Sequence, residues 1–199
     1  IQYGHFSPEP LFHFNQSGAL SNDKSYIIPT NDTFVYGLLN SSVYWLLITS
    51  MCPFVSGGYY EVRAQYIETL PIPSKPKGEI ISTLAEQSQA IAEIRYQCEI
   101  GFKRRLQDLC PADQIFRLNK KLESWWSLDF ASLQKELKKA LEATISLAER
   151  NEWQDYFESE QAKRASLHQQ IQGLEQKLNN EVYKLFDLSV EEILLVEQS

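Results

Sequence analysis

The 199-residue chain is poor in the residues that build metal sites and disulfide frameworks. Its only cysteines, Cys52, Cys98 and Cys110, are widely spaced and form no Cys-x-x-Cys pair, and it has only three histidines. This small supply of soft ligands argues against a metal site. An odd number of scattered cysteines argues against a disulfide framework and favours a reducing compartment, so we expect a cytoplasmic location.

Long apolar runs are also missing. The longest one, Val43 to Ile48, is interrupted at once by Thr49 and Ser50, whereas a membrane-spanning helix needs roughly 20 apolar residues. We therefore expect no membrane partner. The sequence opens with Ile1 in the middle of an aromatic run, without an initiator methionine, and we interpret it as an excised piece of a longer protein.

Catalytic motifs are absent as well. The sequence has neither the Asn/Asp-Pro-Pro-aromatic motif of adenine methyltransferases nor a glycine-rich cofactor loop. Glu136-Leu137-Lys138 matches only the second half of a common nuclease motif, and its helical surroundings indicate a chance match. No serine stands in a nucleophile-elbow context. We predict no catalytic residue in this chain, and whether it belongs to an enzyme stays open from these residues.

The charge balance is unfavourable for DNA binding at first sight. The net charge is −7, whereas contacts to phosphates need lysine and arginine. The distribution is uneven, because the segment from Arg95 to Lys121 holds seven basic and only three acidic residues. Acids predominate from Glu142 to the end. The acidity therefore belongs mainly to the distal part of the chain, and DNA contact is not excluded.

Short strands and helices are predicted for the first 52 residues. Leu11–Phe14 and Ser25–Ile28 read as a hairpin, with a turn signal at Asn15–Gly18 and Lys24 near its tip. Two consecutive helices should follow, and both should carry a side-chain cap at the first residue. The first runs over Val35–Leu39 after Asn31 or Asp32; the second runs over Val43–Ser50 after Asn40-Ser41-Ser42.

A change of character follows at residues 57–73. Gly57 and Gly58 permit backbone angles that other residues avoid, and Tyr59–Val62 has the aromatic and β-branched composition of a strand. Pro71 and Pro73 impose extended geometry on the residues before them. We predict a strand, a rigid exit and then a helix beginning near Pro76.

Helical periodicity dominates the remainder. A seam of spacing four and three predicts a helix over about 78–108, and its members are Ile80, Leu84, Gln87, Ile91, Ile94 and Cys98. A shorter helix is predicted over Ala112–Trp126, and Asp129 should cap another that contains Leu133, Leu137 and Leu141.

A second seam predicts the longest helix, over about 147–186, and it comprises Leu167, Ile171, Leu174, Leu178, Val182 and Leu185. Ser146–Glu149 has the form of a capping box at its start, and Ser189–Glu192 has the same form before a terminal helix. We predict that the two seams pack antiparallel, in the manner of a coiled coil. The oligomeric state, and whether each seam packs within one chain, stay open.

Three stretches together resemble the target-recognition domains of restriction-modification enzymes. They are Gly57-Gly58-Tyr59-Tyr60 followed by Gln65-Tyr66-Ile67-Glu68-Thr69-Leu70-Pro71-Ile72-Pro73; Tyr36-Gly37-Leu38-Leu39-Asn40-Ser41; and Val182 to Ile193. Such domains occur in type I specificity subunits, and C-terminal to the catalytic domain of type IIG enzymes and related adenine-specific DNA methyltransferases. The single-chain branch fits better, because the segment between Trp125 and Trp153 is too short and too helical for a second recognition lobe.

This resemblance implies an α+β, mostly α fold. Residues 1–75 would form a partial, small mixed α/β recognition lobe, and residues 76–199 a helical domain with long antiparallel coiled-coil-like helices. The chain would recognise double-stranded DNA and pack against the methyltransferase or nuclease domain of the same polypeptide. That part would use S-adenosylmethionine to methylate adenine, and Mg²⁺ if it also cleaves DNA. We expect no cofactor in this chain itself.

The residues expected to contact DNA are Tyr59, Tyr60, Arg63, Lys24, Lys103, Arg104 and Arg105. Aromatic rings stack on bases or sugars, and arginine can donate two hydrogen bonds to guanine, whereas a basic helix end holds phosphates. Arg117, Lys120, Lys121 and the loop His5–Ser7 are further candidates. The alternative for each is ordinary packing or a solvated face. The alternative function is an acidic helical interaction or dimerisation module that does not bind DNA.

Overall fold

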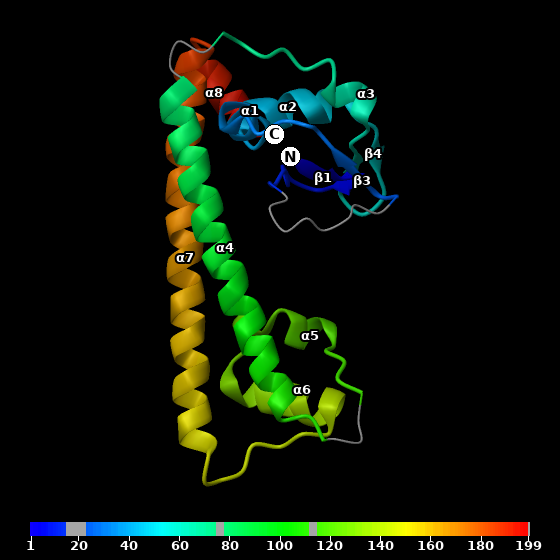
Figure 1. Cartoon of the computed structure of the whole chain (residues 1–199), viewed down its shortest axis with the longest axis vertical. Helices are drawn as coiled ribbons and strands as arrows, with labels where there is room; N and C mark the ends of the chain where they lie inside the picture. The colour runs from blue at the N-terminus through cyan, green and yellow to red at the C-terminus, as the bar shows by residue number, and fades with distance from the viewer. Residues whose placement is uncertain (15–22, 75–77, 112–114, 199) are drawn as a thin grey trace. The chain divides into compact units, whose positions relative to one another are not determined.

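The computed structural model of the chain describes residues 1–14, 23–74, 78–111 and 115–198 (Figure 1). The residues form two compact units: unit 1 comprises 1–90 and 172–199, and unit 2 comprises 91–171. The long helices α4 (Gly78–Asp108) and α7 (Arg150–Leu185) contribute residues to both. The fold is α+β and mostly α, as predicted, but the division differs from the predicted boundary at residue 75.

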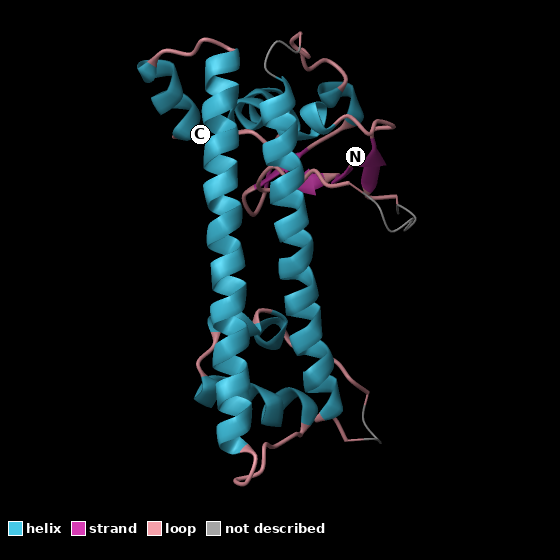
Figure 2. Cartoon of the chain, turned by 60° about the vertical axis from the view of Figure 1, so that its left-hand side comes forward, coloured by secondary structure: helices cyan, strands magenta, loops and turns pink. Residues whose placement is uncertain are grey.

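All described strands belong to unit 1 (Figure 2). Strand β1 (Gln2–Gly4) pairs antiparallel with β3 (Ser25–Ile27). A second sheet has the antiparallel order β2-β5-β4, formed by Phe6–Ser7, Tyr59–Glu61 and Phe54–Val55. Gly57 and Gly58 join β4 to β5 with φ of 85° and 82°, a region that favours glycine, which explains the glycine pair.

The predicted hairpin of Leu11–Phe14 with Ser25–Ile28 is wrong. Ser25–Ile27 pairs with Gln2–Gly4 instead, and His13 makes only an isolated bridge to Gln2. The aromatic core gives the reason, because Tyr3 of β1 lies 5.3 Å from Tyr26 of β3, between ring centroids. The predicted turn at 15–18 and the helix start near Pro76 lie outside the described residues.

Side-chain caps start the first two helices, as predicted. The Asp32 carboxylate accepts from the N–H groups of Phe34 and Val35 at the start of α1 (Thr33–Leu39). The Ser41 hydroxyl accepts from the Tyr44 N–H at the start of α2 (Ser42–Met51). A short helix, α3 (Ala64–Ile67), follows β5 and was not predicted.

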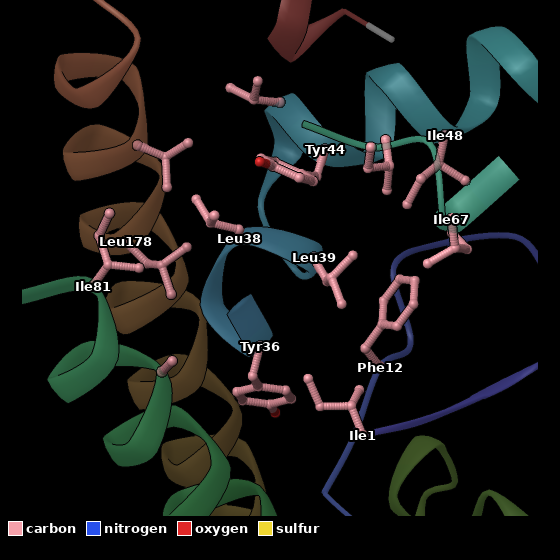
Figure 3. Close-up of a cluster of buried hydrophobic side chains, with 14 of the residues drawn as sticks. Ile1, Phe12, Tyr36, Leu38, Leu39, Tyr44, Ile48, Ile67, Ile81 and Leu178 are labelled. Carbon is pink, nitrogen blue, oxygen red and sulfur yellow. The ribbon is translucent and has the colours of Figure 1, made fainter. Parts of the chain in front are cut away.

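The core of unit 1 joins segments that are far apart in the sequence (Figure 3). Leu38 of α1 points toward Ile81 of α4 and Leu178 of α7. Gly37 allows this close approach, since a Cβ there would lie 2.8 Å from the Ile81 side chain. On the other side of α1, Leu39 faces Phe12, a loop residue, and Tyr3 of β1 belongs to the same core.

The core of unit 2 is helical and aromatic. Trp125 stacks on Phe102 at 4.0 Å between ring centroids, and both are fully buried together with Phe157. Besides α4 and α7, the unit contains α5 (Lys120–Glu123), the 3₁₀-helix η1 (Trp125–Ser127) and α6 (Phe130–Leu141). Asp129 caps α6 by accepting from the Ser132 N–H, which confirms that prediction.

The predicted helix over Ala112–Trp126 is wrong. Residues 115–119 are not helical, and α5 begins only at Lys120. The Asn119 side chain accepts from the N–H groups of Lys121 and Leu122, so Asn119 acts as a helix cap and not as a helix-interior residue. Residues 112–114 lie outside the described part of the chain.

The two long helices pack together, and in unit 2 their direction is plainly antiparallel. Arg95 of α4 meets His168 of α7, whereas Cys98, three residues later, meets Glu160 of α7. The seam predicted on α7 is confirmed, with Ile171, Leu178 and Val182 buried. The helix begins at Arg150. Before it, the Ser146 hydroxyl accepts from the Glu149 N–H, which is one of the two bonds of the predicted capping box, and donates to the Glu149 carboxylate.

The seam predicted on α4 is displaced by one residue in its first half. Ile80 is 51% exposed, whereas Ile81 and Ala85 are buried; farther along, Ile94 is also 51% exposed and Cys98 is buried. The α4 sequence offers apolar residues on both sides of the predicted row, so the spacing alone does not choose the buried face. The last helix, α8 (Val190–Glu197), has the predicted capping box between Ser189 and Glu192.

Among the described helices, none combines the length and apolar character needed to cross a bilayer alone. The pair α1–α2, bent by 64°, meets that criterion only when its two helices are taken together.

Candidate nucleic-acid interface

Side chains along β5 alternate between two faces, and this alternation separates the predicted DNA-contacting residues of unit 1. Tyr59 is 43% exposed, Val62 is buried and Arg63 is about half exposed. Because successive side chains of extended backbone point to opposite faces, Tyr59, Glu61 and Arg63 share one face. Tyr60 belongs to the other face, with Val62. The sheet thus separates two tyrosines that are adjacent in the sequence.

Tyr60 is mainly a packing residue. Its ring meets the Trp45 ring of α2 edge-on at 5.7 Å and the Phe54 ring of β4 at 5.3 Å. This is the packing alternative considered for Tyr60. Phe54 itself is 66% exposed, so it is an exposed aromatic ring that the sequence analysis did not single out.

Glu61 holds the Arg63 side chain in place. The guanidinium of Arg63 donates to Glu61 Oε1 at 2.8 Å, and His5 Nε2 lies 3.0 Å from the same oxygen. The hydrogen bond with Arg63 and, to a smaller extent, the one with His5 lower the pKa of the Glu61 carboxyl. The same carboxylate raises the pKa of Arg63. Arg63 is therefore a charged group with a defined orientation and not a freely moving surface cation.

Phe6 of strand β2, and His5 just before the strand, lie next to Glu61. Phe6 pairs with Glu61 across the sheet, stacks on His5 at 4.5 Å and is 49% exposed. The Lys24 carbonyl accepts from the His5 N–H at 2.9 Å, so Lys24 also lies beside this cluster. We call the set His5, Phe6, Tyr59, Glu61 and Arg63 the β5 surface. The loop His5–Ser7 is among the candidates from the sequence, but only strand pairing shows that His5 and Phe6 lie beside Glu61.

The basic residues predicted in unit 2 are differently placed. Lys103 forms an ion pair with Glu123, and Arg105 lies 3.6 Å from Asp108. Arg104 is exposed and forms no ion pair with the described residues. The basic run on α4 is therefore largely neutralised by neighbouring acids.

Of the further candidates in unit 2, Lys121 is also paired with an acid. Lys121 donates to Glu136 of α6 at 3.0 Å, and Asn119 donates to the other oxygen of this buried carboxylate at 2.9 Å. The Lys121 ammonium lowers the pKa of Glu136. Arg117 and Lys120 are exposed. Glu136 belongs to α6, not to a strand, which agrees with the chance interpretation of its nuclease-like context.

Polar side chains between α4 and α7 provide no reactive centre. The Cys98 thiol donates to Glu160 Oε2 at 3.2 Å. Burial, with a smaller contribution from this hydrogen bond, raises the pKa of Cys98 to about 11. The thiol is thus protonated at neutral pH and is a poor nucleophile. Within the described residues, no three His, Cys, Asp or Glu side chains gather in a way that could hold a metal ion.

Comparison with known families finds a match for the helical part of the chain. Residues 74–182 match the family described as "Domain of unknown function (DUF8810)". The chain belongs to this family. The matched segment runs from just before α4 to near the end of α7, so it includes all of unit 2. No curated protein and no solved structure matches the chain.

Proposed function

We propose that the chain is the sequence-recognition and helical spacer part of a restriction-modification enzyme, and that the β5 surface contacts double-stranded DNA. The observation that carries the proposal is the shared face of Tyr59 and Arg63, on which an exposed ring and a guanidinium paired with Glu61 both face outward. An oriented arginine can donate two hydrogen bonds to one guanine, and an exposed ring can stack on a sugar or an unpaired base. Methylation of adenine would belong to another part of the polypeptide.

The charge of unit 1 limits the affinity that this surface can reach. Glu61 offsets one of the nearby cations, and only Lys24, Arg63 and Lys75 are basic before residue 76. Because affinity for DNA grows with the number of neutralised phosphates, this chain by itself should bind DNA weakly and with a shallow salt dependence. Sequence preference would then come mostly from contacts to bases.

The test is a selection from a pool of random DNA duplexes at low salt, with the wild-type chain, Arg63→Ala and Arg104→Ala. Wild type should enrich a short motif, and Arg63→Ala should lose preference at one position, equivalent to about 1–3 kcal/mol. Arg104→Ala should leave the motif unchanged. The proposal fails if no motif is enriched, or if Arg63→Ala and wild type enrich the same one.

Glu61→Gln refines this test. The amide keeps the shape of the side chain but removes the charge that pairs with Arg63, so Arg63 should lose its fixed orientation. Discrimination between cognate and mismatched duplexes should fall, while non-specific binding should rise slightly because one negative charge is lost. Unchanged discrimination would show that Glu61 does not orient a base-reading group.

One observation favours the alternative function, a protein interaction module. Helix α8 exposes Val190, Leu194 and Leu195 by 69%, 51% and 65%, which is unusual for three residues of one short helix. Sedimentation of wild type and Leu195→Ser would test it. Association that Leu195→Ser abolishes, together with no motif in the DNA selection, would replace the first proposal with this one.

A further inference from the structure

A small pocket of unit 1 lies between α2, α7 and α8. Its volume is about 240 Å³, and its lining residues are Pro10, Ser42, Trp45, Asn179, Tyr183, Val196 and Glu197. An apolar cavity of about 150 Å³ in another protein accommodates benzene. The pocket therefore has room for a ligand somewhat larger than a single six-membered ring.

Tyr183 supplies a hydroxyl group that lacks a partner. The residue is only 4% exposed, and its phenolic oxygen has no hydrogen-bond partner among the described residues. Ser42 Oγ, which accepts from Asn179 Nδ2 at 2.9 Å, is close enough to oppose part of the rise in the Tyr183 pKa, but the two hydroxyl groups do not have the geometry of a hydrogen bond. Burial raises the pKa of Tyr183, so the hydroxyl is neutral and able to donate at physiological pH. Buried hydroxyl groups are nearly always paired, so this hydroxyl is available to an acceptor that enters the pocket.

Glu197 of α8 gives the pocket a negative charge. Its carboxylate acts on the Tyr183 phenol, whose pKa it raises further, and it forms no ion pair with any residue that the structure describes. Trp45 and Tyr183 add two aromatic residues to the same lining. Aromatic rings combined with a carboxylate attract a cation, because the ring faces carry partial negative charge.

We propose that this pocket binds a small organic cation that also carries an oxygen acceptor, that is, a substituted alkylammonium of about the size of choline. The ammonium group would lie against the aromatic residues and Glu197, and the oxygen would accept from the Tyr183 hydroxyl. This site is separate from the β5 surface and does not depend on the proposed DNA recognition.

The direct test is an NMR titration of the isotope-labelled chain with choline, tetramethylammonium and the uncharged carbon analogue of choline. Choline should shift the amide signals of Ser42, Asn179 and Glu197 and the indole signal of Trp45. The uncharged analogue should bind about 10-fold more weakly, because it lacks the attraction between a cation and aromatic rings. No shifts with choline at tens of millimolar, or equal binding of the uncharged analogue, would overturn the proposal.

Two substitutions separate the roles of the polar groups. Glu197→Gln should weaken choline and tetramethylammonium alike, by roughly 5-fold, because both carry the charge. Tyr183→Phe should weaken choline by roughly 5-fold and leave tetramethylammonium unchanged, because only choline has an oxygen that can accept the hydrogen bond.

Glu191→Gln is the matched control, since it removes the same charge from α8 at a residue that does not line the pocket. It should leave both affinities unchanged. A loss equal to that of Glu197→Gln would show only a general effect of negative charge and would refute the site. Glu197 and Glu191 are both exposed, so these two variants remain informative even if Tyr183→Phe does not fold.

Discussion

Unit 1 and unit 2 both have aromatic cores, but they use their charged residues differently. In unit 2, Lys103 and Lys121 pair with Glu123 and Glu136, so the basic stretch of the sequence mostly stabilises contacts among α4, α5 and α6. In unit 1 the few charged groups of the β5 surface lie beside exposed rings. A run of basic residues in a sequence therefore does not by itself predict a surface of unpaired positive charge.

The two cores also differ in how far apart in the sequence their packed residues are. Unit 2 is one continuous segment, residues 91–171, whereas unit 1 combines residues 1–90 with 172–199. Contacts between distant segments close long loops, which costs conformational entropy. Because the buried side chains form two separate clusters, we expect the two units to respond separately to damage in their cores, and the following substitutions test this expectation.

The largest effect is expected for Trp125→Ala. Trp125 is fully buried against Phe102 and Phe157, and truncating such a side chain costs about 3–5 kcal/mol. Hydrogen exchange should become faster in α5 and α6 while α1 and α2 keep their protection. Equal loss of protection in all four helices would show that the units unfold as one.

A smaller loss is expected for Leu178→Ala in the core of unit 1, at about 2–5 kcal/mol. Ile80→Ala is its control, because Ile80 occupies the predicted α4 seam but is half exposed. This control should change stability by no more than about 0.5 kcal/mol. Urea denaturation of both variants measures the difference, and similar losses would contradict the α4 face found here.

The charged pair of unit 2 makes a prediction about pH. Lys121 lowers the pKa of Glu136, so the folded state favours the carboxylate. Its stabilisation is fully present above the ordinary glutamate pKa of about 4.3 and is lost as the pH falls through the lower, folded-state pKa. Stability measured from neutral to acid pH should fall less steeply in Glu136→Gln than in wild type. Identical slopes would contradict this assignment.

The smallest effects concern the basic run itself. Lys103→Ala removes an ion pair at the surface and should cost about 0.2–1 kcal/mol, with a smaller effect at high salt. Arg104→Ala should change stability by less than about 0.5 kcal/mol, because Arg104 forms no ion pair with described residues. Thermal denaturation at two salt concentrations compares them, and a larger, salt-sensitive loss for Arg104→Ala would reverse the assignment.

The candidate site could be predicted only in part. Tyr59 and Arg63 were recognised from their position after a glycine pair, and the structure places both on an exposed face of β5. The pairing of Phe6 with Glu61 could not be foreseen, because strands of two and three residues carry too little periodicity to reveal their partners. The sequence predicts Tyr60 among the DNA-contacting residues because two adjacent tyrosines look equivalent in a sequence. Only the strand shows that their side chains lie on opposite faces.

Interactions within a few residues were determined by the sequence alone. The caps at Asp129 and Ser189 are the predicted ones, and those at Asp32 and Ser41 lie within the short stretches that the sequence indicated. Like the positive φ angles of Gly57 and Gly58, they depend on local hydrogen bonds and backbone angles. The partner of β3, the buried face of α4 and the neutralisation of Lys103 were decided by the tertiary structure. Each depends on which distant residue packs alongside, and several pairings satisfy the same local pattern until the core selects one.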